Sequence, residues 1–154
     1  MSTNKKERGE VITYEFKHTL PVQIRFNDID TLGHVNNTVY FSFFDLGKSK
    51  YFTEARKGEV DWEKVDIVVA NINCNFLAPI FFNENIAVQT QVNYIHEKSF
   101  KITQQLINLD TAEVKCSCAT IMVGFDVENC VAIPISNEWV ECLSAFEGRN
   151  LKES

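Results

Sequence analysis

The sequence lacks the features that would direct a protein to nucleic acid or into a membrane. It has 15 Lys and Arg residues against 21 Asp and Glu residues, and the formal net charge of −6 leaves no broad basic surface for nucleic acid. The N-terminal residues are polar, unlike a signal peptide, and no apolar run approaches the ~20 residues that span a bilayer. We therefore expect a cytoplasmic protein that binds neither nucleic acid nor membrane.

Cysteine is present, but not in a pattern that indicates disulfides or a metal. The five cysteines are odd in number and form no CxxC pair. Cys116 and Cys118 share one face of a predicted strand, but no His or Cys partner stands near them in the sequence to complete a metal site. We interpret the cysteines as small apolar residues in a reducing cytosol and predict no metal site.

Glycine and proline are scarce, with six and three residues, and the chain contains no repeat or low-complexity linker. At 154 residues it has the length of one domain. Residues 1–10 are rich in Lys, Glu, Ser and Asn and predict a disordered tail. Residues 11–150 are expected to form a single domain.

Alternating apolar residues predict strands, and apolar residues at three- and four-residue spacing predict two helices. The strands are expected at 11–27, 66–76, 86–94, 100–107 and 114–125. A helix of about 20 residues should begin at Asn36 or Asn37 and end at Gly58, and a short helix should cover 138–146. This order favours an α+β fold in which strands two to five form an antiparallel meander and the long helix covers one face.

Gly47 falls within the apolar stripe of the long helix, between Phe44 and Tyr51. Because glycine in a helix costs ~1 kcal/mol against alanine, we expect another part of the backbone to approach the helix closely here. One helix cannot cover both faces of a five-stranded sheet. We therefore also expect association of copies through a sheet face or edge.

Polar side chains crowd into the connection between the first strand and the long helix. Val22, Ile24 and Phe26 alternate with Gln23 and Arg25, as in a half-buried strand. The connection that follows contains two carboxylates, one histidine and two asparagines: Asp28, Asp30, His34, Asn36 and Asn37. Loops held between rigid elements carry chemistry more often than cores do, so this loop is the candidate site.

The chemistry available there depends on the start of the helix. A helix N-terminus presents unpaired N–H groups and roughly half a positive charge. Such donors stabilise the oxyanion that forms when a carbonyl is attacked, and a nearby carboxylate can attack that carbonyl or activate a water. Position alone leaves a second interpretation of Asp30, as a turn or cap carboxylate that binds local N–H groups.

Residues 28–37 read DIDTLGHVNN, and Tyr40 follows them. The segment resembles the signature of hotdog-fold acyl-CoA thioesterases, in the GHVNN variant of the 4-hydroxybenzoyl-CoA thioesterase-like group. The resemblance covers roughly residues 20–125. It implies a hotdog fold, in which a five-stranded antiparallel sheet wraps around one long helix. It also implies hydrolysis of acyl-CoA or acyl carrier protein thioesters without a cofactor, by a homodimer or homotetramer whose sites lie at the subunit interface.

The resemblance also implies residue roles. Asp30 matches the catalytic carboxylate, and the N–H near Asn37 matches the donor that polarises the thioester carbonyl. His34 matches a histidine that a related branch, the plant acyl carrier thioesterases, recruits for catalysis, although Leu32 stands at that branch's asparagine position. The alternative for His34 is a residue that orients the turn by hydrogen bonding. Asn36, Asn37 and Tyr40 are candidates for substrate contact.

Three further positions carry alternatives. Lys98 and Ser99, at a strand start that recurs in the family, could bind the phosphates or the pantetheine arm of CoA, or be solvated. Asp28 is interpreted as solvated or paired with an arginine. The family's long helix has an acidic residue followed three positions later by arginine. Here Asp45 is followed by Lys48, which keeps the charges without the fork geometry of arginine.

The sequence predicts a thioester hydrolase, and two other functions stay open. One is a non-catalytic acyl-CoA binding protein or sensor, because a fold does not fix a function. The other is a dehydratase acting on hydroxyacyl thioesters. In hotdog proteins that chemistry uses a histidine with an acidic partner in a different pattern, which this loop does not resemble.

Overall fold

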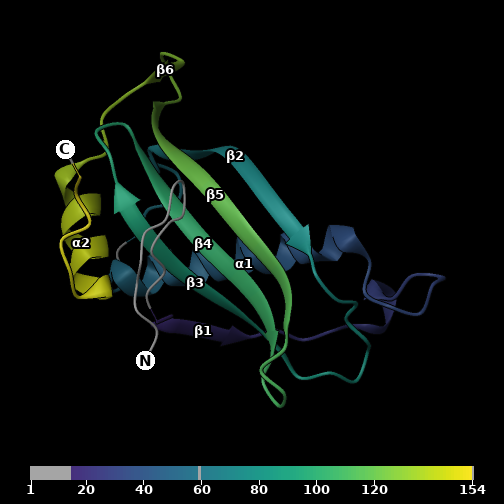
Figure 1. The fold of residues 1–154 in the computed structure, drawn as a ribbon. Coiled ribbons are helices and arrows are strands. Elements are labelled where there is room, and N and C mark those ends of the chain that lie inside the picture. The colour runs from purple at the N-terminus through teal and green to yellow at the C-terminus, as the bar shows by residue number, and fades with distance from the viewer. Residues whose placement is uncertain (1–14, 59, 154) are drawn as a thin grey trace.

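The computed structural model describes residues 15–58 and 60–153, so the expected tail (1–10) and the start of the first expected strand lie outside the described residues. The elements follow one another as strands and helices with the long helix near the beginning (Figure 1). They are β1 (His18–Pro21), the 3-10 turn η1 (Phe26–Asp28), α1 (Asn37–Ala55), β2 (Ile67–Phe76), β3 (Ile86–Ile95), β4 (Ser99–Asn108), β5 (Val114–Asp126), β6 (Val131–Ala132) and α2 (Asn137–Glu147).

The expected α+β architecture is confirmed. The strands form one antiparallel sheet in the order β1-β3-β4-β5-β2, and the two-residue β6 adds a sixth strand beside β5. Figure 1 shows α1 crossing one face of this sheet, with α2 at one end. Within residues 15–58 and 60–153, no helix is long and apolar enough to span a membrane.

The expected pairing of strands two to five as a continuous meander is wrong. Only β3, β4 and β5 form a meander, whereas β2 pairs with β5 and forms the far edge of the sheet. The turns at 96–98 and 109–113 are short enough for hairpins, but residues 77–85 are too many for one and contain Pro79. This long connection carries the chain past β5 and β4, from one edge of the meander to the other.

The first strand is shorter than predicted. β1 ends at Pro21, which has no N–H to donate to a ladder. Val22 and Ile24 still pack on the core as expected, but Phe26 is 81% exposed instead of half-buried. The reason is the turn at η1, where the Asp28 carboxylate accepts the Arg25 N–H at 2.8 Å and ends the extended run.

The long helix begins and ends where its local signals predict. Asn36 is its N-cap, and Gly58, with φ of +82°, follows its end. Gly47 is buried against the sheet, but the groups nearest to it are the side chains of Val88 and Gln104. The three atoms nearest to a Cβ at this position thus belong to side chains of the sheet, where a backbone neighbour was expected.

The apolar core has two parts that lie at opposite ends of the sheet. One part joins α2 to the Ile95 and Phe100 end, and Ser136 caps α2. The other part lies under the first half of α1 and contains Val35 and Ile80, from the two loops that meet there. The second part supports the candidate site.

Candidate active site

The loop that precedes α1 is held by a small ladder of backbone hydrogen bonds. Ile29 and Val35 form an antiparallel bridge, the Asp30 N–H donates to the His34 carbonyl at 3.0 Å, and the Asn36 N–H donates to the Asp28 carbonyl at 2.9 Å. Residues 30–34 therefore form a tight turn that projects from the sheet. Asp28 anchors the turn where it leaves the preceding segment. This residue is only 2% exposed and is paired with Arg25, as one of the two interpretations of Asp28 predicted.

Asp30 lies in this turn with part of its carboxylate engaged. Its Oδ1 accepts the Leu32 N–H at 2.9 Å, and its carbonyl accepts the N–H of Gly33 at 3.1 Å. Gly33 has φ of +88°, a conformation that suits glycine. Within the described part of the chain, Oδ2 of Asp30 takes part in no hydrogen bond. The turn interpretation of Asp30 is thus correct for one oxygen and leaves the other available for chemistry.

The start of α1 supplies donors beside this turn. The Asn36 Oδ1 accepts both the N–H and the hydroxyl of Thr38 at 2.9 Å, and the Asn36 carbonyl accepts the Val39 N–H. Among the residues that the structure describes, the N–H of Asn37 has no acceptor. A substrate carbonyl at this helix N-terminus would meet that donor and the positive end of the helix dipole.

Aromatic side chains enclose this corner of the molecule. Tyr40 is 3% exposed, its ring lies 5.4 Å from the Phe76 ring, and burial raises the pKa of its hydroxyl. His34 is half-buried and meets the Phe81 ring edge-on at 5.8 Å. The large apolar side chains around the loop are nevertheless partly exposed: Phe26, Leu32, Phe76, Leu77, Phe81 and Phe82. They form an apolar rim at the turn.

The remaining predicted residues lie elsewhere. Ser99 faces Val123 at the start of β4, and the exposed Lys98 precedes it. The loop and α1's first turn lie at the other end of β4, roughly 30 Å away for a ten-residue strand. In one chain the structure thus brings Asp30, His34, Asn36, Asn37 and Tyr40 together. It does not bring Lys98 and Ser99 to them.

On α1, Asp45 and Lys48, which replace the acidic residue and arginine of the family pattern, form an ion pair. Lys48 Nζ lies 3.3 Å from Asp45 Oδ1, with the lysine side chain buried and the aspartate exposed. An exposed partner makes this a weak ion pair. The pair lies outside the turn that holds Asp30.

Sequence reasoning missed the connection between β2 and β3 as part of the site. The Val35 N–H donates to the Ile80 carbonyl at 2.8 Å, and the neighbouring Phe81 and Phe82 rings contact His34 and Phe26. Its length and its run of aromatic residues after Pro79 were signals that this segment packs on something. Its partner could not be read from the sequence.

The cysteines are reduced, and two of them meet across strands. Cys74 and Cys118 lie opposite each other on β2 and β5 with their sulfur atoms 3.1 Å apart. Burial raises the pKa of Cys118 to about 12 and that of Cys116 to about 11, so both are neutral thiols. In residues 15–58 and 60–153 no group of three His, Cys, Asp or Glu side chains could hold a metal ion.

Comparison with known proteins gives a consistent result. A family model described as the thioesterase-like superfamily matches residues 24–143. Among curated proteins, the Acyl-CoA thioester hydrolase YbgC of Escherichia coli is 24% identical over 64% of this chain and 78% of its own length. The long-chain acyl-CoA thioesterase FadM of Escherichia coli is 22% identical over 79% of this chain and 93% of its own.

Solved structures share the fold. A Thermus thermophilus thioesterase complexed with coenzyme A and Zn superposes with a TM-score of 0.77 at 27% identity, covering 87% of this chain and 96% of that one. A 4-hydroxybenzoyl-CoA thioesterase in complex with 4-hydroxybenzoyl-CoA superposes with a TM-score of 0.73 at 19% identity, covering 82% and 98%. The second likeness concerns the fold alone.

Proposed function

Because the chain belongs to the thioesterase-like superfamily, we propose that it hydrolyses acyl-CoA thioesters to a free acid and the CoA thiol. The observation that carries this proposal is the free Asp30 Oδ2 in the turn that leads directly into the start of α1, where the Asn37 N–H is open. Two acyl-CoA thioesterases among the relatives and a CoA complex among the similar structures support the substrate class.

In the proposed mechanism, the N–H of Asn37 donates to the thioester carbonyl oxygen and stabilises the oxyanion that forms there. The Asp30 carboxylate either attacks the carbonyl carbon or takes a proton from the attacking water. In the first route, loss of the thiolate leaves a mixed anhydride on Asp30, which water hydrolyses to the free acid and the restored carboxylate, and the proton from this water goes to the thiolate. In the second route, the carbon–sulfur bond of the tetrahedral intermediate breaks and the thiolate takes the proton held by Asp30. Asn36 keeps the helix start in place, Tyr40 forms an apolar wall, and His34 is the second candidate for proton transfer.

We further propose that two copies complete each site by pairing their β2 strands. β2 is an edge strand whose side chains on the α1 side include the half-exposed Val69, Ile72 and Phe76. Such an edge favours pairing with another strand. If two β2 strands pair antiparallel around a two-fold axis, the Phe76 end of one copy lies beside the Ile67 end of the other.

This pairing explains the position of the two distant candidates. Ser99 pairs with Val123 at the same end of the sheet as Ile67. In the proposed dimer, Lys98 and Ser99 of the second copy therefore come to the end at which Asp30 lies. They would contact the phosphates or pantetheine arm of CoA. Assembly of dimers into a tetramer and use of acyl carrier protein are compatible with this arrangement, and the free thiols suit the cytoplasm.

The first experiment measures thiol release from short, medium, long and aromatic acyl-CoAs by the wild type and Asp30→Asn. We expect the variant to lose at least about a hundredfold in kcat, because it removes the reacting carboxylate. Glu141→Gln is the control, since it makes the same carboxylate-to-amide change at an exposed position on α2, a helix that packs on β3 and not on the β2 edge. Equal turnover by all three proteins would remove Asp30 from the mechanism. Binding without turnover by the wild type would favour the acyl-CoA binder.

The shared site has its own test in mixtures of inactive variants. Asp30→Asn and Lys98→Ala are unfolded and refolded separately and together. If Asp30 and Lys98 act from different copies, a mixed dimer contains one intact site, and the mixture recovers activity that neither variant has alone. No recovery in a mixture shown to exchange subunits would contradict the proposed pairing.

A further inference from the structure

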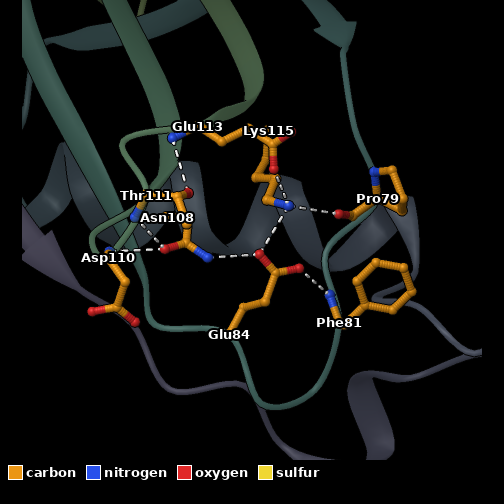
Figure 2. Close-up of polar contacts among 8 residues, drawn as sticks. All are labelled: Pro79, Phe81, Glu84, Asn108, Asp110, Thr111, Glu113 and Lys115. Carbon is orange, nitrogen blue, oxygen red and sulfur yellow. Dashed lines mark hydrogen bonds and ion pairs between the residues drawn. The ribbon is translucent and has the colours of Figure 1, made fainter.

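A buried lysine lies next to the candidate site and takes no part in the proposed chemistry. Lys115, near the start of β5, has a side chain that is only 5% exposed. Its Nζ lies 2.8 Å from Glu84 Oε2, 2.6 Å from Glu113 Oε1 and 3.1 Å from the carbonyl oxygen of Pro79 (Figure 2). All three donor positions of the ammonium are thus matched by an acceptor.

Glu84 connects this lysine to the rest of the β2–β3 connection. Its Oε2 also accepts the Asn108 Nδ2 at 2.8 Å, and its Oε1 accepts the Phe81 N–H at 2.9 Å. The Asn108 Oδ1 in turn accepts the N–H groups of Asp110 and Thr111 in the β4–β5 turn. One carboxylate therefore ties the end of the meander to the segment 79–84.

The backbone of Lys115 strengthens the same attachment. Its carbonyl accepts the N–H groups of Leu77 at 2.9 Å and Ala78 at 3.1 Å. With the bonds to Pro79, Phe81 and Glu84, the connection is fixed on both sides of Ile80. Residues in a long connection are otherwise free to adopt many conformations, because no ladder of hydrogen bonds determines their path.

Ile80 is the point at which this segment meets the site. It is 0% exposed, and its carbonyl accepts the Val35 N–H at 2.8 Å, two residues before α1 begins. The adjacent Phe81 ring contacts His34. The position of segment 79–81 therefore determines where the last residues of the turn lie, and with them the angle between Asp30 and the Asn37 N–H.

A lysine is an expensive choice for a buried position unless its charge is used. Burying an ammonium costs several kcal/mol, and well-packed apolar residues often replace buried ion pairs without loss of stability. What an apolar side chain could not do here is bind the Pro79 carbonyl and the Glu84 carboxylate together. The contacts of Lys115 thus fix the position of segment 79–84 more than they add to the stability of the fold.

We propose that Lys115 is a positioning residue for the thioesterase site, holding segment 79–84 through Glu84 and the Pro79 carbonyl so that Ile80 fixes the start of α1. The proposal rests on the proposed function for its effect on turnover. Its structural part, the control of Val35 by Lys115, does not depend on that function. The two parts can therefore be measured separately.

The test compares Lys115→Met, the double variant Lys115→Met/Glu84→Gln and the control Tyr51→Phe. The double variant leaves no unpaired buried charge, so it should fold even if the single variant does not. Tyr51→Phe removes a buried hydrogen bond to Glu147 at the opposite end of the core, and it shows what lost stability alone does. Each variant is assayed for kcat and KM, and for amide hydrogen exchange at Val35 by NMR.

We expect each Lys115 variant that folds to lower kcat at least about tenfold, with KM changed by less than about twofold, because the donor and the carboxylate lose their alignment. Val35 should exchange at least about tenfold faster in them, while amides in the second half of α1 keep their rates. Tyr51→Phe should change neither value. An unchanged kcat with unchanged Val35 exchange would overturn the proposal, as would an equal loss of kcat in Tyr51→Phe at matched stability.

A wild type without thioesterase activity would refute the proposed function, but it would not refute the proposal that Lys115 positions Val35. In that case the rate of amide hydrogen exchange at Val35 is the only test of the role of Lys115. Faster exchange in the Lys115 variants would support the positioning role for whatever binds at this loop. Exchange at the wild-type rate would reject it.

Discussion

The contact of Gly47 in the long helix with the sheet gives a quantitative test of the fold. A Cβ at Gly47 would lie 2.9 Å from both γ carbons of Val88 and 3.0 Å from Gln104 Nε2. Neither neighbour can move easily. Val88 is 0% exposed within β3, and Gln104 donates to the Phe44 carbonyl at 2.9 Å and to Thr90 at 3.0 Å. Gly47→Ala should therefore overfill this contact.

Two opposing effects determine the size of the change. Alanine favours a helix over glycine by ~1 kcal/mol, whereas an extra methyl group in a well-packed core costs ~1–3 kcal/mol. Because the contacts at Gly47 are short and its neighbours are held, we expect the second effect to win. The free energy of unfolding should fall by up to ~2 kcal/mol, with a drop in Tm of roughly 2–4 °C for each kcal/mol.

Chemical and thermal unfolding measure this change, at one fixed protein concentration because association of copies would shift the transition. A double-mutant cycle with Val88→Ala identifies the cause, since space vacated at Val88 should accommodate the new methyl group. We expect a favourable coupling of at least ~0.5 kcal/mol between the two changes. A Gly47→Ala variant that is more stable than the wild type, with no coupling to Val88→Ala, would refute this account of the packing.

Three further predictions concern ionisable groups. Burial alone would raise the pKa of Glu84, but its hydrogen bonds outweigh burial and lower it, so its stabilising effect is present above its unfolded pKa and disappears as the pH falls through the lowered value. Glu84→Gln should thus lose less stability in acid titration than the wild type. The neutral thiol of Cys118 should resist alkylation at pH 8, whereas the exposed Cys130 should be alkylated first. Mass spectrometry of the alkylated protein measures this order. Tyr51→Phe should lower the free energy of unfolding by ~1.5–3 kcal/mol, because the hydroxyl binds the buried Glu147 carboxylate at 2.5 Å.

The parts of the fold that depend on neighbouring residues could be predicted from the sequence. The apolar spacing of α1, its cap at Asn36 and its stop before Gly58 are local signals, and each is confirmed. The same holds for α2 after Ser136 and for the alternation of β4. The loop with Asp30 was found because its residue types and order are dense in one short segment.

The parts of the fold that depend on residues distant in the sequence could not be predicted. The alternation of β2 is compatible with pairing to β3 or to β5, and only the length of the intervening connection argues against the first. Lys115 has the ordinary appearance of a solvated strand lysine, because Glu84 and the Pro79 carbonyl are separated from it by two strands of sequence. Phe26 follows two half-buried residues in phase, yet the Arg25–Asp28 contact turns it outward.

The proposed pairing of β2 strands would explain two features that look unrelated in one chain. The edge strand β2 leaves Val69, Ile72 and Phe76 half-exposed, and the Lys98–Ser99 segment lies at the wrong end of the sheet to reach Asp30. A single operation, antiparallel pairing of β2 with a second copy, both covers the edge and moves that segment to the loop. An arrangement through the opposite edge, β1, would do neither. In the proposed dimer the subunit interface and the substrate site would therefore share the β2 edge, and a change at this edge should be measured in turnover as well as in molecular mass.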